Sequence, residues 1–162
     1  KCMEITLEQG LAAAVRYIQD HAVEGTKLYF DEIPESFFVP SVYFQIPYTS
    51  GRKVTLRSYA VKTTLNCWFM ERYDWDAEAK AADMRDMLLL DNCCIPVYEE
   101  NGTKAGYAVR VAEPETRKID EGIVQLSFSF EVYFHPGQSH EKMQRMYTAW
   151  NNIKRAVAQT GG

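Results

Sequence analysis

The sequence lacks the short motifs by which enzymes are usually identified. It has no Gly-rich phosphate loop, no HExxH, no GxSxG and no CxxC pair, which removes the familiar signatures of nucleotide binding, zinc proteolysis, serine hydrolysis and thiol redox chemistry. No run of about 18 apolar residues occurs, so we expect no membrane-spanning helix. No signal peptide is visible ahead of the first helix pattern. We therefore expect a protein that is not an enzyme and that binds no cofactor, metal or membrane.

Cysteine is present but is not spaced for a metal site. Two of the four cysteines are adjacent, and no second Cys or His pair complements them. We interpret all four as buried free thiols in a reducing compartment: Cys2, Cys67, Cys93 and Cys94. Cys67 lies between Leu65 and Phe69 in an apolar stretch, so we expect it in the core.

Two weak alternatives involve titratable side chains. His135 and His140 flank a Pro-Gly break and could share a metal, although no third ligand is obvious; a solvated turn is the preferred interpretation. Four glutamates crowd the second predicted hairpin and could hold a general acid–base pair: Glu99, Glu100, Glu113 and Glu115. A solvated acidic edge that discourages strand addition is the interpretation we prefer.

The charge is small but unevenly distributed. The 162 residues carry a formal net charge of −4, which argues against specific nucleic-acid binding. From Gln138 onward the chain has four basic residues and one acid, so the tail is +3 and the remainder is −7. An acidic body with a basic tail suggests a tail that docks elsewhere.

Two long stretches with alternating side chains dominate the sequence. From Ile123 to Phe134 every second residue is apolar, which predicts a twelve-residue strand with one buried face. A long apolar strand at a sheet edge would invite aggregation, so we place it at the centre. The run from Val54 to Met70 alternates in the same way, and its length favours pairing with the first stretch.

Three helices are predicted from apolar residues at helical spacing. The first begins at Thr6, where Thr6 and Gln9 form a capping-box pattern, and ends near Gly25. The second begins at Asp74 or Asp76 and runs to about Leu90. The third spans Gln138 to Ala158, with one apolar stripe: Met143, Met146, Tyr147, Trp150, Ile153 and Val157.

Shorter strands and turns complete the pattern. We predict strands at 27–30 and 41–48, a turn at 49–51, and a hairpin of strands 95–99 and 105–112 around Asn101-Gly102, the strongest short hairpin signal in the chain. A second turn is expected at 117–122. The fold class is therefore α+β: a mixed, largely antiparallel sheet with two helices on one face and an additional C-terminal helix.

Four stretches of the sequence are similar to a phage protein family. They are Tyr29–Ile33, Phe37–Phe44, Tyr59–Phe69 and Asp120–Phe130. Together with the order of helices and strands over residues 5–134, they resemble the small tail-terminator or tail-completion proteins of tailed phages, in the form found in prophages and phage-like contractile particles of Gram-positive bacteria.

The resemblance implies a structural protein of a virion tail, assembled in the bacterial cytoplasm. Such proteins form a ring, expected to be a hexamer, that caps the tail tube and contacts the tube, the sheath or the neck and head–tail connector proteins. The implied partners are thus copies of the chain itself and these tail components. Two alternatives stay open: an adaptor that binds through the C-terminal helix, and a small enzyme with an acidic site.

The resemblance divides the chain into a tail-terminator-like domain, residues 1–137, and a C-terminal helical extension, residues 138–162. We expect the helical extension to leave the sheet and to pack on an adjacent subunit or a sheath or neck protein. Interface candidates come from two projecting turns and from this helix: Tyr48, Arg52, Lys53, Glu100, Asn101, Lys104, Lys142, Arg145, Met146, Trp150, Lys154 and Arg155.

Overall fold

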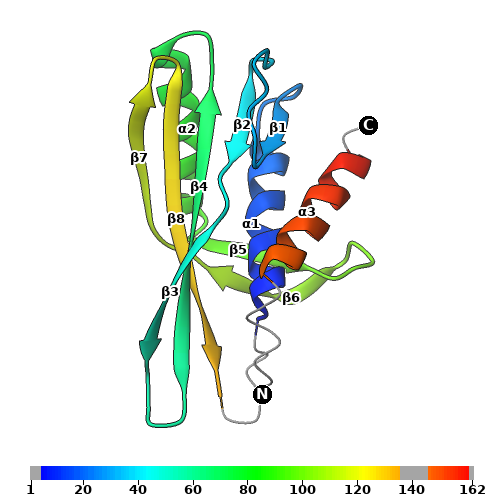
Figure 1. The fold of residues 1–162 in the computed structure, drawn as a ribbon, viewed down its shortest axis with the longest axis vertical. Coiled ribbons are helices and arrows are strands. Elements are labelled where there is room, and N and C mark those ends of the chain that lie inside the picture. The colour runs from blue at the N-terminus through cyan, green and yellow to red at the C-terminus, as the bar shows by residue number, and fades with distance from the viewer. Residues whose placement is uncertain (1–4, 136–145, 161–162) are drawn as a thin grey trace.

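The computed structural model describes residues 5–135 and 146–160. These hold three helices and eight strands: α1 Leu7–His21, β1 Lys27–Phe30, β2 Ser41–Phe44, β3 Tyr48–Lys53, β4 Tyr59–Met70, α2 Asp74–Leu90, β5 Cys94–Tyr98, β6 Lys104–Arg110, β7 Ala112–Asp120, β8 Ile123–Phe134 and α3 Met146–Thr160 (Figure 1). The predicted α+β class is confirmed. The predicted domain boundary at residue 137 lies outside the described residues and stays a prediction.

The two long alternating stretches pair as predicted. β4 and β8 run antiparallel in unbroken register for twelve residues, from Tyr59 opposite Phe134 to Met70 opposite Ile123. They form the centre of a sheet with the order β1-β2-β4-β8-β7, and β3 also pairs with β4. Only β1 and β2 pair in parallel, while the other pairs are antiparallel, so the sheet is mixed.

The far edge of β4 is shared by two strands in succession. β2 pairs with residues 67–70 of β4 and β3 pairs with residues 59–64. Buried Pro47 lies in the break between β2 and β3, where it has no N–H to donate to a ladder. Three predictions were wrong here. The strand predicted at 41–48 ends at Phe44, and Tyr48 begins the next strand. Residues 49–51 lie in a strand, and the turn is at 54–58, where the amide N–H of Val54 donates to the Ser58 carbonyl over 3.0 Å.

The second half of the chain contains one strand that the sequence did not predict. β7 occupies residues 112–120 and pairs with β8. Its sequence is polar because it lies at a sheet edge where few side chains are buried, so it lacks the apolar alternation that would have predicted a strand. The turn before β8 is therefore shorter than the predicted 117–122. β5 and β6 form the predicted hairpin, and it is a separate two-stranded sheet. Gly102 in its turn has φ +83°, a conformation that glycine adopts without strain.

The core lies between one face of the main sheet and the helices α1 and α2. The even-numbered side chains of β8 point into it, and apolar residues of α1, β4, α2 and β8 are buried there: Leu11, Val15, Ile18, Leu65, Phe69, Leu88, Leu126, Phe128 and Phe130. Each helix supplies a single apolar stripe, and for α2 this is Ala77, Ala81, Met84 and Leu88. The alternation of β8 therefore fixes which face both helices cover.

The two helix N-termini differ from each other. At α1 the capping box is confirmed: the Gln9 amide N–H donates to Thr6 Oγ1 over 3.2 Å and Gln9 Oε1 accepts from the Thr6 amide over 3.1 Å. At α2 the predicted aspartate cap was wrong, since Tyr73 is the N-cap and makes no side-chain cap bond. Asp74 instead accepts from the Gly122 amide over 2.5 Å and from Lys118 Nζ over 2.8 Å. These bonds, which lower the pKa of Asp74, tie α2 to the β7–β8 turn.

The C-terminal helix packs on its own chain, which corrects our expectation that it leaves the sheet. Trp150 and Ile153 are buried. The Trp150 ring lies edge-on to Phe30 with centroids 5.6 Å apart, and its Nε1–H donates to Asp31 Oδ1 over 2.9 Å. Lys154 forms an ion pair with the other oxygen of Asp31. Asp31 presents its carboxylate here because it follows β1 with φ +65°, a conformation that aspartate tolerates better than most residues.

Gly10 tests how closely α1 packs on the sheet. A Cβ at this position would overlap the buried Phe130 ring. Gly10→Ala should therefore destabilise the fold by about 1–3 kcal/mol through overpacking, although alanine alone would favour a helix by about 0.5–1 kcal/mol. Urea denaturation measures the difference. Adding Phe130→Leu to Gly10→Ala should recover part of the loss; a Gly10→Ala protein more stable than wild type would contradict this packing.

Trp150 tests the position of α3. Trp150→Ala should lower the free energy of unfolding by about 3–5 kcal/mol, as expected for a buried aromatic residue. Trp150→Phe keeps most of the ring contact with Phe30 and loses one hydrogen bond, so it should cost only about 1 kcal/mol. Both are measured by urea denaturation of the monomer. An unchanged stability for Trp150→Ala would mean that α3 does not belong to this core.

Candidate assembly surface

The main sheet continues past its helices as a three-stranded ribbon. We use the word ribbon for β3, residues 59–64 of β4 and residues 130–134 of β8, which lie side by side in that order. Figure 1 shows these strands reaching beyond the ends of α1 and α2. All six residues of β3 are exposed. The predicted interface residues Tyr48, Arg52 and Lys53 therefore lie on an exposed strand of this ribbon, although we had expected a turn there.

An ion pair crosses the ribbon on the face opposite the helices. Arg52 Nε donates to Glu131 Oε1 over 2.9 Å and Arg52 Nη2 to Glu131 Oε2 over 2.8 Å, a two-point contact. Tyr133 also donates to this carboxylate, over 3.1 Å. The guanidinium of Arg52 is the largest cause that lowers the pKa of Glu131 from its ordinary 4.5 to about 2. The side chain of Arg52 thus reaches across β4 and connects β3 to β8 through this ion pair.

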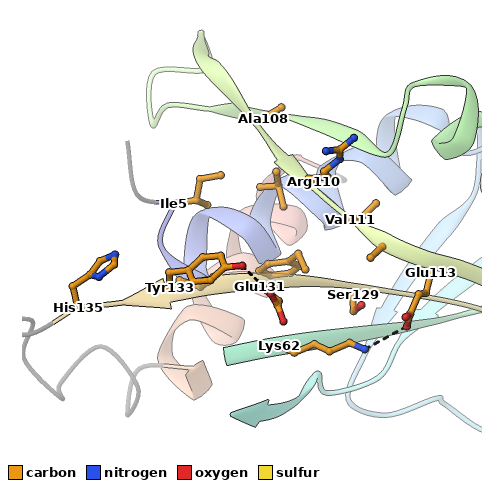
Figure 2. A pocket seen from close by; sticks show the side chains of 14 residues that line it. Ile5, Lys62, Ala108, Arg110, Val111, Glu113, Ser129, Glu131, Tyr133 and His135 are labelled. Atoms are coloured by element: carbon orange, nitrogen blue, oxygen red, sulfur yellow. Dashed lines mark hydrogen bonds and ion pairs between the residues drawn. The ribbon is translucent and has the colours of Figure 1, made fainter. Parts of the chain in front are cut away.

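A groove runs beside the end of β8. It has a volume of about 780 Å³, and its walls are residues 108–113 on one side and residues 129–133 on the other. Figure 2 shows the two walls diverging from a junction near Ser129, with Lys62 and Glu113 joined across the sheet; their Nζ to Oε2 distance is 3.3 Å. The groove is open, polar at its rim and apolar at Ile5, Phe130 and Val132.

The second group of predicted interface residues lies at a different place. Glu100, Asn101 and Lys104 are exposed at the tip of the β5–β6 hairpin, which projects on the side of the molecule away from β7 (Figure 1). Asn101 Oδ1 closes the turn by accepting from the Thr103 amide over 2.9 Å. The hairpin tip and the ribbon are therefore two separate projections that share no residue.

The third group, on α3, is only partly available to a partner. Trp150 and Lys154 are engaged with Asp31 of the same chain, so they are not a free surface, while Arg155 is exposed. Lys142 and Arg145 lie outside the described residues, as does the Met146 side chain. The packing of Trp150 and Lys154 removes the main support for an adaptor that binds through the apolar side of α3.

The residues considered for chemistry do not converge. Glu99 and Glu100 are at the hairpin tip, whereas Glu113 and Glu115 are on β7, where Glu113 pairs with Lys62. His140 and Cys2 lie outside the described residues. Within residues 5–135 and 146–160 no three His, Cys, Asp or Glu side chains are placed to share a metal, and no described helix is long and apolar enough to cross a membrane.

The remaining cysteines are only partly as predicted. Cys67 is fully buried, which raises the pKa of its thiol. Cys93 is half-buried and Cys94 is exposed, so the prediction that all the thiols are buried was wrong for Cys94. The reason is that the pair lies at the start of β5, at the surface end of that strand.

Sequence reasoning missed one residue of the ribbon and one in the turn beside it. Glu131 was assigned to the solvent face of its strand, and the alternation pattern gave no sign that Arg52, far away in sequence, pairs with it. Leu56, at the tip of the β3–β4 turn, is 95% exposed, and we had placed it inside a strand.

Comparison with known proteins points to a phage-like element. No model of a known protein family matches the chain. The chain is 28% identical over 110 residues to the phage-like element PBSX protein XkdJ of Bacillus subtilis strain 168, and this covers 67% of the chain and 75% of the relative. It is also 30% identical over 95 residues to the uncharacterized protein YqbJ of the same strain, which covers 59% of the chain and 66% of that relative.

The Arg52–Glu131 pair predicts a pH dependence. Because the pKa of Glu131 is depressed in the folded state, its stabilisation is complete above about pH 4.5 and is lost as the pH falls through about 2. Glu131→Gln should therefore cost about 0.2–1 kcal/mol at pH 7, as for other exposed ion pairs, and almost nothing near pH 2. Urea midpoints between pH 2 and 7 measure this. Arg52→Gln is the matched control and should show the same convergence; a constant difference down to pH 2 would refute the pairing.

Proposed function

We propose that this protein is a structural component of a phage-derived tail and acts as its terminator. The observation that carries the proposal is the similarity over 110 residues to a protein of a phage-like element. The motif resemblance described above, over residues 5–134, specifies the role: a ring that caps the head-proximal end of the tail tube and stops its growth. The ring is proposed to be a hexamer and to meet the tube on one side and the sheath or neck on the other.

The shape of the subunit is suited to a closed ring. A ring needs two different patches on each subunit, one of which meets the other patch on the next copy. The ribbon and the β5–β6 hairpin tip are two such projections, and they point away from the core in different directions (Figure 1). We propose that the hairpin tip, with Glu100, Asn101 and Lys104, rests on a neighbouring subunit or on the tube. Lys142, Arg145, Met146 and Arg155 remain candidates for contact with the sheath or neck.

Deletion of the gene in the producing bacterium tests this role. If the protein ends tube growth, particles made without it should have tubes of variable and often excessive length, or tails that fail to join heads. Electron micrographs of induced cultures measure tail length. Supplying the gene from a plasmid should restore a single length. Tails of normal length and composition in the deletion strain would refute the proposed function.

Shortening the hairpin tests its part in assembly. Replacing residues 100–104 by a two-residue Asn-Gly turn should preserve the monomer, because the tip is exposed and surface loops tolerate such changes. The oligomer peak in light scattering should then shrink or disappear while the thermal melting curve of the monomer stays unchanged. Unaltered assembly would show that the tip lies outside every interface.

A further inference from the structure

We propose that β3 of one copy pairs, as a parallel strand, with the uncovered end of β8 in a second copy. The inference deepens the proposed function, because it rests on assembly of this chain into a ring and names the surfaces that join the subunits. It starts from an incomplete ladder. β7 covers β8 only from Ile123 to Ser129, so among the residues that the structure describes the last five of β8 have a strand on one side alone.

The hydrogen bonds show which backbone groups of β8 point outward. The Glu71 amide donates to the Gly122 carbonyl over 2.9 Å, and residues 71 and 122 continue the register of β4 and β8. Hydrogen-bonded pairs recur at every second residue of an antiparallel ladder. Phe130, Val132 and Phe134 therefore bond to β4, while the N–H and C=O groups of Glu131 and Tyr133 point away from it. Among the described residues no strand meets these groups.

The same reasoning applies to β3. The Val54 amide bonds to the Ser58 carbonyl, and residues 54 and 58 continue the register in which Arg52 is opposite Ala60. Tyr48, Ser50 and Arg52 therefore bond to β4. Thr49, Gly51 and Lys53 direct their N–H and C=O groups outward, and no described strand pairs with that edge. The ribbon thus has two open edges, and each presents backbone donors and acceptors.

The groove beside β8 provides room for an added strand. Its other wall is β6, and that wall diverges from β8 at the junction of Val111 and Ala112 (Figure 2). An incoming strand lies about 4.8 Å from its partner, so it enters the opening between the walls. β3 can enter because all of its residues are exposed and, within the described part of the chain, β4 is the strand paired with it. Two β8 ends cannot approach each other in this way, since each brings its own β6 wall into the space that the other needs.

Cyclic symmetry determines the direction of the pairing. Within one ribbon β3 and β8 are both antiparallel to β4 and so are parallel to each other. Copies placed side by side around an axis therefore bring β3 to β8 in parallel. In a parallel ladder, a residue forms hydrogen bonds with the two residues on either side of the one that lies directly opposite it on the partner strand. The register that uses every outward group of Glu131 and Tyr133 within β3 places Glu131 opposite Ser50, and Tyr133 opposite Arg52, of the next copy.

The two edges also differ in charge. β3 and the turn that follows it carry Arg52, Lys53 and Arg57 and no acid. The residues that line the groove beside the end of β8 include two carboxylates, Glu113 and Glu131, and two cations, Lys62 and Arg110. Two β3 edges placed together would bring only cations near each other, whereas β3 against the groove side also meets carboxylates, and this favours β3 against β8 over β3 against β3.

Cysteine cross-linking tests the pairing. In a background of Cys2→Ser, Cys93→Ser and Cys94→Ser, the double variant Ser50→Cys/Glu131→Cys should form covalent oligomers up to the ring size on mild oxidation. These positions cannot join within one chain, because Lys62 lies between them in the sheet and two strand spacings are about 9.5 Å, beyond the roughly 7 Å limit for a disulfide. The matched control, Ser50→Cys/Gln125→Cys, places the second thiol where β7 covers β8 and should stay monomeric on a denaturing gel.

Gly51→Pro gives a second measurement. It removes one outward N–H and leaves the β3–β4 bonds, which proline permits at an edge strand. The oligomer peak in light scattering should be lost, with the monomer melting curve unchanged.

Three outcomes would overturn the pairing: covalent dimers from Glu131→Cys alone, assembled protein without cross-linking of Ser50→Cys/Glu131→Cys, or a chain that is monomeric under all conditions. Tail lengths in the deletion strain report on the terminator role separately. Normal tails with successful cross-linking would therefore reject that role and keep the strand pairing.

Discussion

The antiparallel pairing of β4 with β8 is the interaction on which the rest of the molecule depends. It supplies twelve consecutive residue pairs, a buried face on which α1 and α2 pack, and an opposite face that carries the Arg52–Glu131 pair. Both helices use small residues to approach this pair of strands, as Gly10 does against Phe130. The strands that flank the pair are shorter and cover only parts of it. β7 covers one end of β8, whereas β3, which lies beside β4 at the other end of the pair, is exposed.

The sequence predicted those parts of the fold that depend on local pattern. Alternation identified β8 and all of β4, although the predicted run began five residues too early, at Val54. Helical stripes identified α1 and α2, and Asn101-Gly102 identified a hairpin. It failed where tertiary contacts overrule local signals. Thr49-Ser50-Gly51 is typical of a turn but forms a strand because β4 offers an edge beside it. Asp74 is typical of a helix cap, yet its carboxylate is used by Gly122 and Lys118.

The candidate site was predicted in the same partial way. Exposed polar residues at Tyr48, Arg52 and Lys53 could be selected because projecting segments carry them, and the structure places them on an exposed strand. The open edges themselves could not be predicted, since an unpaired N–H depends on where a neighbouring strand ends. The C-terminal helix shows the opposite error. Its stripe and charge suggested a partner, but Asp31, brought near by the chain reversal after β1, binds both Trp150 and Lys154.

The ribbon is a direct continuation of the strands that form the core, and this limits how its length can change in evolution. Side chains alternate along a strand, so the insertion of one residue into β8 before Glu131 would turn every later side chain to the other face. Insertions in pairs keep the faces, but they must occur in β3, β4 and β8 together to keep the three registers. The reach of this ribbon in related proteins should therefore vary in steps of two residues per strand, about 6.6 Å each, and not continuously.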